Sequence, residues 1–278
     1  MILLGIRVVV AGADGNMGSL VVKNVLNDPE LELCGGITVE GSPNIGRDAG
    51  NVVGLAECGV KIVDSRNLSN YLKEIKPDIY VDFTTANALK NNIKDVLENK
   101  INFVIGTTGI DQDTIQIIEK KVKESNLSGV IAPNMAVGVN VFFQMATILT
   151  KYLPGFDIEI IEAHHNRKRD APSGTALKVA TLIAKELNQD IDKIGKFGRK
   201  KGPEKRVPGE IGVHAIRAGD IVGEHTIIFA GPGERIELIH RAHSRQCFAE
   251  GTIKAIKFIH KNKDAGKIFD MFDVLGLK

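Results

Sequence analysis

The chain has 278 residues, of which 43% are hydrophobic and 25% are charged, a composition that excludes a disordered or fibrous protein. Its 36 lysine and arginine residues nearly balance 34 aspartate and glutamate residues, so the net charge of +2 predicts no bulk attraction to nucleic acid. The length predicts two domains.

Strands and helices alternate along the first half of the chain. Short runs rich in valine and isoleucine predict buried strands, and apolar residues at helical spacing predict helices between them. The strands are expected at residues 6–11, 31–39, 60–63, 78–83, 103–105 and 129–132, and the helices at residues 16–26, 69–75, 86–98 and 114–125. This alternation is typical of an α/β protein with a Rossmann-like, doubly wound parallel sheet, whose ligand crevice lies at the carboxyl ends of the strands.

The pattern changes after Asn134. The expected helices then span residues 137–152 and 175–187, and strands with period-two alternation are expected at residues 157–163, 210–217, 225–230 and 235–241. These elements predict a second, α+β domain that contains a mixed sheet. A last helix, at residues 248–261, is expected to pack on the first domain. The first domain would comprise residues 1–135 plus 246–278, and the second residues 136–245.

Residues 195–208 are rich in glycine, lysine, arginine and proline and lack periodicity, so we expect a mobile loop there. Cys34, Cys58 and Cys247 are widely spaced and predict free thiols in a reducing cytosol, not a disulfide or a metal site. The apolar run at residues 1–10 is too short to span a membrane, and no later run is long enough. We expect a cytoplasmic protein without a membrane partner.

Glycines mark the turn between the first strand and the first helix, in the sequence Gly12-Ala13-Asp14-Gly15-Asn16-Met17-Gly18. In a dinucleotide site the first glycine permits the tight turn, the second lets the backbone approach a pyrophosphate, and the third lets the helix pack close to the strand. The helix N-terminus adds free N–H groups and partial positive charge. The spacing departs from strict GxGxxG, so a glycine turn without a ligand is the alternative, but the position favours a cofactor site at residues 12–17.

The end of the second strand is where a dinucleotide site carries an acid for the adenosine ribose, or a basic residue for a 2′-phosphate. The residues there are Thr38, Val39 and Glu40, and no arginine stands beside them in the sequence. Glu40 would either hold the ribose of NAD or be a solvated loop charge. The choice between NADH and NADPH therefore stays open.

Two other loops follow strands at the expected crevice. They contain Gly106, Thr107 and Thr108, with Gly109 closing the first loop, and Ala132, Pro133, Asn134 and Met135 in the second. Small and hydroxylic residues can approach a nicotinamide ring and bind its carboxamide. Turn chemistry and a helix cap would explain the first loop equally well, but its place in a Rossmann-like domain favours a cofactor contact.

A dense cluster of titratable and cationic side chains follows the strand at residues 157–163. It comprises His164, His165, Arg167, Lys168 and Arg169. Such a cluster is either an anion site or a solvated basic loop. A turn then enters the next helix, so the amides of Gly174 and Thr175 should point outward at the helix N-terminus and bind a carboxylate. This convergence favours an acidic small molecule as the ligand.

Hydride addition to a conjugated imine or enamine also requires a proton, which a lysine or histidine can supply. Lys168 suits this role, because crowding by His164, His165 and Arg169 would favour its neutral form and make it a better acid when protonated. No Ser-His-Asp arrangement or metal-ligand spacing is evident, so hydrolytic and metal mechanisms are not expected.

Together these motifs resemble those of the 4-hydroxy-tetrahydrodipicolinate reductase family, also called the dihydrodipicolinate reductases. The segment Glu162-Ala163-His164-His165, with residues 170–175 after it, is highly specific to that family. The resemblance spans nearly the whole chain and includes residues 12–18, 81–84, 104–109, 137–140, 159–177, 206–209, 217–226 and 269–271.

The resemblance implies an activity and a role for each candidate residue. The family uses NADH or NADPH to reduce 4-hydroxy-tetrahydrodipicolinate to tetrahydrodipicolinate in lysine and diaminopimelate biosynthesis, and it forms homotetramers through the sheet of the second domain. His164 would be the acid/base histidine and Lys168 the proton donor. His165, Gly174 and Thr175 would bind the carboxylates of the small dicarboxylate substrate. Residues 12–17, 106–108 and 132–135 would contact the cofactor.

This chain departs from the family pattern at the cofactor residues. Thr38 and Val39 stand where bacterial members often show an acidic–arginine pair, and Thr85 stands where an arginine often follows Asp-Phe-Thr. Both changes remove contacts to a 2′-phosphate. Met135 replaces an aromatic residue that can lie against the nicotinamide, a change of packing more than of chemistry.

Two other functions stay open on the sequence. An aspartate- or homoserine-type dehydrogenase would share a Rossmann domain followed by an α+β domain, but would lack the Glu-Ala-His-His segment. A nicotinamide-sensing protein without catalysis would keep the fold, although the intact His164 and Lys168 speak against it.

Overall fold

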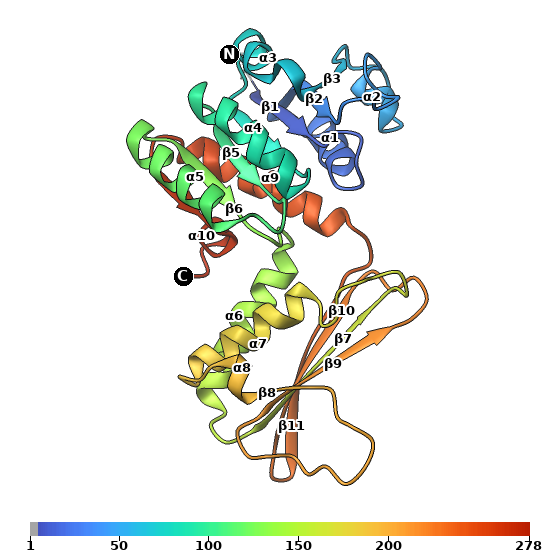
Figure 1. The fold of residues 1–278 in the computed structure, drawn as a ribbon, viewed down its shortest axis with the longest axis vertical. Coiled ribbons are helices and arrows are strands. Elements are labelled where there is room, and N and C mark those ends of the chain that lie inside the picture. Colours follow the sequence, from blue (N-terminus) through green and yellow to red (C-terminus); the bar gives the residue numbers. More distant parts are fainter. Residues whose placement is uncertain (1–4) are drawn as a thin grey trace. The chain divides into compact units, whose positions relative to one another are not determined.

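The computed structural model describes residues 5–278, so the first four residues of the apolar N-terminal run lie outside it. It divides into two compact units (Figure 1). Unit 1 comprises the described residues up to Val137 together with Gln246–Lys278, and unit 2 comprises Gly138–Arg245. No helix among residues 5–278 is long and apolar enough to cross a membrane.

Unit 1 is built on a seven-stranded sheet with the order β12-β6-β5-β4-β1-β2-β3, in which every ladder is parallel. The predicted doubly wound parallel sheet is therefore confirmed. The strands are β1 (Ile6–Ala11), β2 (Leu31–Thr38), β3 (Ile62–Asp64), β4 (Ile79–Asp82), β5 (Asn102–Ile105), β6 (Ser128–Ile131) and β12 (Lys267–Phe269).

Helices cover both faces of this sheet. Because successive side chains of a strand point to opposite faces, β1 places Val8 and Val10 in one hydrophobic core and Val9 and Ala11 in the other. Residues of α1 and α9 complete the first core, and residues of α3, α4 and α5 the second. The helices of unit 1 are α1 (Gly18–Asn27), α2 (Ala49–Val52), α3 (Leu68–Ile75), α4 (Ala86–Glu98), α5 (Gln112–Ser125), α9 (Gln246–Lys261) and α10 (Met271–Leu275), with a 3-10 turn at Ser65–Asn67.

Unit 2 contains a five-stranded sheet with the order β11-β10-β7-β9-β8. β7 pairs antiparallel with β10 and parallel with β9, so the sheet is mixed, as predicted. Helices α6 (Val137–Tyr152), α7 (Gly174–Glu186) and α8 (Ile191–Ile194) accompany it (Figure 1). The strands are β7 (Asp157–His164), β8 (Gly195–Phe197), β9 (Ile211–Arg217), β10 (Glu224–Gly231) and β11 (Glu234–Arg241).

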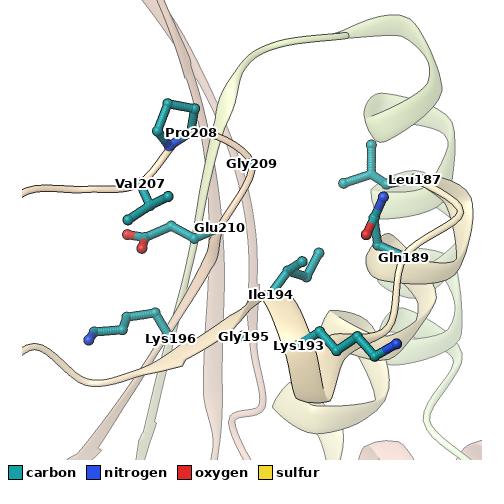
Figure 2. A pocket seen from close by; sticks show the side chains of 10 residues that line it. All are labelled: Leu187, Gln189, Lys193, Ile194, Gly195, Lys196, Val207, Pro208, Gly209 and Glu210. Carbon is teal, nitrogen blue, oxygen red and sulfur yellow. The ribbon is translucent and has the colours of Figure 1, made fainter.

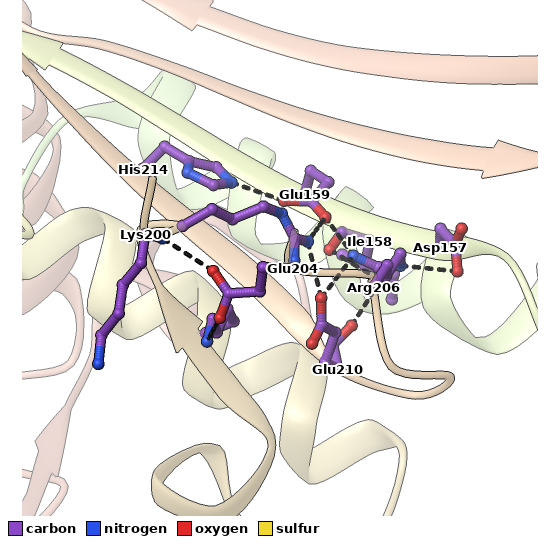
Figure 3. A network of polar contacts seen from close by, with 10 residues as sticks. Asp157, Ile158, Glu159, Lys200, Glu204, Arg206, Glu210 and His214 are labelled. Carbon is purple, nitrogen blue, oxygen red and sulfur yellow. Dashed lines mark hydrogen bonds and ion pairs between the residues drawn. The ribbon is translucent and has the colours of Figure 1, made fainter. Parts of the chain in front are cut away.

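The expectation of a loop throughout residues 195–208 is wrong at its start, because residues 195–197 form β8 and pair with β9. The rest of the segment is tied to the sheet by the ion pairs drawn in Figure 3. Arg199 contacts Glu159 at 2.6 Å, and Arg206 contacts both Glu159 and Asp157, the latter at 2.8 Å. A three-residue strand is too short to show periodicity. Glu159, the acidic partner of Arg199, lies 40 positions earlier in the sequence, so the ion pair is not visible there either.

We expect Gly18→Ala to destabilise unit 1. A Cβ at residue 18 would lie 1.9 Å from the carbonyl oxygen of Gly12, and a backbone atom cannot turn aside as a side chain can. Forced overpacking of this kind predicts a loss of about 2–3 kcal/mol in the free energy of unfolding, measured by chemical denaturation. Gly174→Ala is the control, since a Cβ there meets nothing within 4 Å. Equal stability of the two variants would contradict the prediction.

Candidate active site

The glycine turn of unit 1 lies beside a pocket of about 200 Å³. A Cβ on Gly12 would lie 2.6 Å from the carbonyl oxygen of Phe83, and Gly12 also has φ +78°, so only glycine fits there. A Cβ on Gly15 would lie 3.1 Å from the carbonyl oxygen of Gly12. The pocket is lined by Gly12, Asp14, Gly15, Ile37, Thr38, Val39, Ser65, Thr84, Thr85, Ala88 and Asn92. Bare backbone at the end of parallel strands fits a dinucleotide.

Not every predicted cofactor residue presents its side chain to this pocket. Glu40 is 65% exposed, is not among the lining residues, and forms an ion pair of 3.3 Å with Arg66. The sequence shows no arginine beside Glu40, but the 3-10 turn after β3 brings Arg66 there, because β3 is the parallel neighbour of β2. Ala13 is fully buried in the core and its backbone N–H donates to the carbonyl oxygen of Ile37 at 3.0 Å, and Met17 is partly buried against the same core.

The loop at residues 106–108 is held by a buried carboxylate that the sequence analysis did not single out. Asp82 accepts hydrogen bonds from the hydroxyls of Tyr80, Thr84 and Thr107 at 2.6, 2.7 and 2.6 Å. The Thr107 hydroxyl also accepts from the backbone N–H of Thr84 at 2.9 Å. Thr107 therefore fixes the loop, and the proton of its hydroxyl is already donated to Asp82. A Cβ on Gly106 would lie 2.2 Å from the ring of Phe83, which explains the glycine.

The loop after β6 contains both buried and exposed residues. Met135 is 1% exposed and belongs to the core, so its side chain has a packing role, and Ala132 is also buried. The side-chain oxygen of Asn134 accepts from the backbone N–H of Ala136 at 3.0 Å, which shapes the turn. Pro133 is exposed.

In unit 2 the predicted reactive residues surround a carboxylate to which the sequence analysis gave no role. Glu162, on β7, is completely buried. It lies 2.6 Å from Nδ1 of His164, accepts two hydrogen bonds from Arg217 at 2.7 and 2.8 Å, and accepts one from the backbone N–H of Ser173 at 2.9 Å. One side chain thus joins the end of β7, the end of β9 and the start of α7.

The protonation of this group follows from its contacts. Burial alone would raise the pKa of Glu162, but the bonds from Arg217 and His164 leave it below its usual value, so the carboxylate is ionised. An ionised carboxylate only accepts, so Nδ1 of His164 carries the proton and Nε2 keeps a lone pair. Burial lowers the pKa of His164 in spite of Glu162, so the ring is neutral near pH 7. Gly223 leaves room at Nε2, since a Cβ there would lie 3.1 Å away.

A second histidine supports the start of α7. His225 is paired with Glu162 in the register of β10 and β7, and its Nε2 lies 3.1 Å from the hydroxyl of Ser173. That hydroxyl also caps α7 by accepting from the N–H of Ala176 at 3.2 Å. Burial lowers the pKa of His225 to about 3, so it stays neutral beside the ring of His164, whose centroid is 5.3 Å away.

The remaining predicted residues lie in the turn after β7 and at the start of α7. Nζ of Lys168 is 2.9 Å from a carboxylate oxygen of Asp170, and this contact with Lys168 lowers the pKa of Asp170. Lys168 thus has an acidic partner, Asp170, in addition to the cationic and histidine residues that surround it in the sequence. Nδ1 of His165 is buried and has no hydrogen-bond partner among residues 5–278. Gly174 opens α7 with nothing within 4 Å of where a Cβ would be, and Thr175 follows it.

Sequence reasoning missed Glu162, Arg217 and His225 as site residues. Glu162 had a signal, because it lies two residues before His164 and so on the same face of the strand. Arg217 and His225 lie within residues 217–226, one of the segments that resemble the family, but the sequence does not show what they contact. The pairing of His164 with Arg217 and of Glu162 with His225 shows it. The described part of the chain contains no group of three or more His, Cys, Asp or Glu residues that could hold a metal ion.

A larger pocket of unit 2, of about 580 Å³, is separate from these residues (Figure 2). It lies between the end of α7, α8, β8 and the segment before β9, and it contains none of the predicted site residues. Its lining residues are Leu187, Gln189, Lys193, Ile194, Gly195, Lys196, Val207, Pro208, Gly209 and Glu210. Size alone therefore does not identify the reactive centre.

We expect Glu162→Gln to lower the pKa of His164 further, because the ionised Glu162 raises it in the wild type. The measurement is a titration of the imidazole by NMR. The same variant leaves Arg217 without its anion, which should cost about 3 kcal/mol in the free energy of unfolding.

Glu159→Gln is the matched control. Glu159 lies on the same strand and also contacts a histidine, His214, at 2.6 Å, but it lies away from His164. The pKa of His164 should be unchanged in this variant. Equal effects of the two substitutions on His164 would show that Glu162 has no specific control over it.

Comparison with known proteins gives a consistent result along the chain. A family model described as dihydrodipicolinate reductase, N-terminus, matches residues 6–135, and one described as dihydrodipicolinate reductase, C-terminus, matches residues 138–275. The 4-hydroxy-tetrahydrodipicolinate reductase of Methanosphaera stadtmanae is 46% identical over 98% of this chain and 100% of its own length. That of Methanocaldococcus jannaschii is also 46% identical, over 98% of both chains.

A solved structure supports the same relationship. The dipicolinate-bound dihydrodipicolinate reductase from Paenisporosarcina sp. TG-14 matches with a TM-score of 0.77 at 28% identity. The match covers 97% of this chain and 99% of that chain, so it includes both units.

Proposed function

The chain belongs to the dihydrodipicolinate reductase family, and we propose that the residues around Glu162 carry out its reaction. The protein is an NAD(P)H-dependent oxidoreductase that reduces 4-hydroxy-tetrahydrodipicolinate to tetrahydrodipicolinate in lysine biosynthesis. This reaction adds a hydride and a proton to the substrate and releases water. The observation that carries the assignment of residues is the buried Glu162, which holds His164 beside the N-terminus of α7.

Lys168 is proposed as the proton donor. A lysine side chain can supply the proton that the reaction needs, and Nζ of Lys168 lies in the turn after β7, 2.9 Å from a carboxylate oxygen of Asp170. A substrate carboxylate arriving near Lys168 would take the place of Asp170 as its partner. His164 is proposed as the acid/base residue, because its Nε2 lone pair can accept a proton and Glu162 stabilises the imidazolium that results.

His165, Gly174 and Thr175 are proposed to bind the substrate carboxylates. Gly174 and Thr175 are the first residues of α7, so their amides lie at the positive end of its dipole. His165 directly follows His164, and its Nδ1 has no hydrogen-bond partner among residues 5–278, so this atom can still form a hydrogen bond. The Paenisporosarcina protein is described as dipicolinate bound, and dipicolinate is a small dicarboxylate, which supports this class of ligand.

Unit 1 is proposed as the cofactor-binding domain, and unit 2 as the substrate-binding and oligomerisation domain. When bound, NADH or NADPH supplies the hydride. Residues 12–17 would hold its pyrophosphate with backbone groups, as the bare approach at Gly12 and Gly15 allows. Residues 106–108 and 132–135 would contact the nicotinamide end. As an enzyme of amino-acid biosynthesis the protein is expected in the cytoplasm.

A homotetramer through the sheet of unit 2 is also proposed. The β7, β9, β10 and β11 register places Ile161, Ile216, Ile228 and Ile239 on one face of the sheet, opposite the side chains buried against the helices. Ile216 and Ile239 are 46% and 42% exposed. The same face also carries polar side chains, at Glu159, His214, Thr226 and Glu237. Exposed isoleucines among polar residues are compatible with an interface between subunits.

We expect Lys168→Ala to reduce kcat at least about a hundredfold, because a general acid contributes on that scale. The assay follows the loss of absorbance of NADH or NADPH, with substrate formed in situ from pyruvate and aspartate semialdehyde. Lys185→Ala removes an exposed lysine from the far end of α7 and should leave kcat unchanged. An unchanged kcat in Lys168→Ala would reduce Lys168 to a surface charge.

We expect the double substitution Ile216→Asp with Ile239→Asp to dissociate the tetramer, because it places charge in an apolar interface. The mass in solution is measured by sedimentation velocity. Ile117→Asp, at an equally exposed isoleucine of unit 1, is the control and should keep the wild-type mass. A monomeric wild type would refute the proposed assembly directly.

A further inference from the structure

The pocket at the end of β2 contains an acid that is not on the strand. The carboxylate of Asp14, in the glycine turn, lines it together with Thr38 and Val39. We propose that Asp14 binds the adenosine ribose hydroxyls and makes this chain prefer NADH to NADPH. This proposal rests on the cofactor site proposed above. The ribose acid would thus come from the first turn of the fold, where β2 itself supplies only Thr38 and Val39.

The contacts of Asp14 hold its carboxylate in place without neutralising it. It accepts hydrogen bonds from the hydroxyls of Thr38 and Ser42 at 2.5 and 2.6 Å and from the side-chain amide of Asn44 at 3.2 Å. All three donors are uncharged, and no ion pair of Asp14 exists within residues 5–278. Burial would raise the pKa of Asp14, but these bonds leave it below its usual value, so the group is an anion near neutral pH.

An anion in this position distinguishes the two cofactors. Ribose hydroxyls can donate hydrogen bonds to a carboxylate, and such charge-assisted bonds are stronger than neutral ones. A 2′-phosphate dianion, the main form above a pKa of about 6, has no donor, so its charge would repel the carboxylate of Asp14 in a pocket of about 200 Å³. Thr38, Val39 and Thr85 add no positive charge to that pocket.

The nearby cation does not reverse this preference. Arg66 follows Ser65, which lines the pocket, but Arg66 itself is 66% exposed and is not a lining residue. Its guanidinium is held by Asp64 at 2.6 Å and by Glu40 at 3.3 Å, so its charge is already balanced by two carboxylates. Glu40 faces Arg66 and does not line the pocket, so Asp14 is the better-placed acid for the ribose.

The test is equilibrium binding, by isothermal titration calorimetry with NADH and with NADPH. The wild type should bind NADH at least about tenfold more tightly. Asp14→Asn keeps the size of the side chain and removes its charge, so the preference should fall to about threefold or less, through weaker NADH binding and stronger NADPH binding. Glu40→Gln removes a carboxylate outside the pocket and should keep the wild-type ratio.

Titrations of the wild type with 5′-AMP and with 2′,5′-ADP repeat the comparison without the nicotinamide and without any variant. Tighter binding of 5′-AMP supports the proposal even if Asp14→Asn does not fold. Equal binding of NADH and NADPH by the wild type, or a loss of both to the same extent in a folded Asp14→Asn, would overturn it. Binding of neither cofactor, with no turnover, would instead refute the proposed reductase function.

Discussion

The buried carboxylate of Glu162 is the interaction on which unit 2 depends. It lies in a completely buried position, where an unpaired charge would be severely destabilising, and Arg217 balances it with two hydrogen bonds. Its other two contacts fix the tautomer of His164 and the backbone of Ser173. The orientation of His164, the proposed acid/base residue, and the position of the helix end proposed to bind a carboxylate therefore depend on the same side chain. His225 adds to this support through the Ser173 hydroxyl.

Much of this arrangement could be predicted from local patterns. The helix at residues 86–98 and the strand at residues 6–11 have the predicted bounds, because their apolar spacing is long and regular. Elements of three to five residues, such as β8, β12 and α10, carry too few positions to show a period. The residues of the motif after β7 were identifiable by type, but the partners that orient them come from other strands and depend on the register.

The cofactor site shows a similar limit to what the sequence alone can predict. A search for the ribose acid at the end of β2 finds only Glu40, which the structure places against Arg66. Asp14 is among the cofactor residues 12–17 predicted from the sequence, but its position in the glycine turn suggests a backbone role and not a contact with the ribose. Parallel pairing of β1 and β2 brings that turn beside Thr38, and the hydrogen bond between Asp14 and Thr38 makes one polar surface from two motifs. The proposed ribose site therefore combines residues that are distant in the sequence and adjacent in the fold.

The return of α9 and β12 to unit 1 has a consequence for biosynthesis of the chain. β12 pairs with β6 although about 140 residues separate them, and α9 supplies Ala255, Ile256 and Ile259 to the core beside α1. During synthesis on the ribosome, the first unit keeps β6 unpaired on one side and an apolar face uncovered until the last segment emerges. Unit 2 has all its strands in one continuous stretch and can close earlier, so the order of folding reverses the order in which the two units begin.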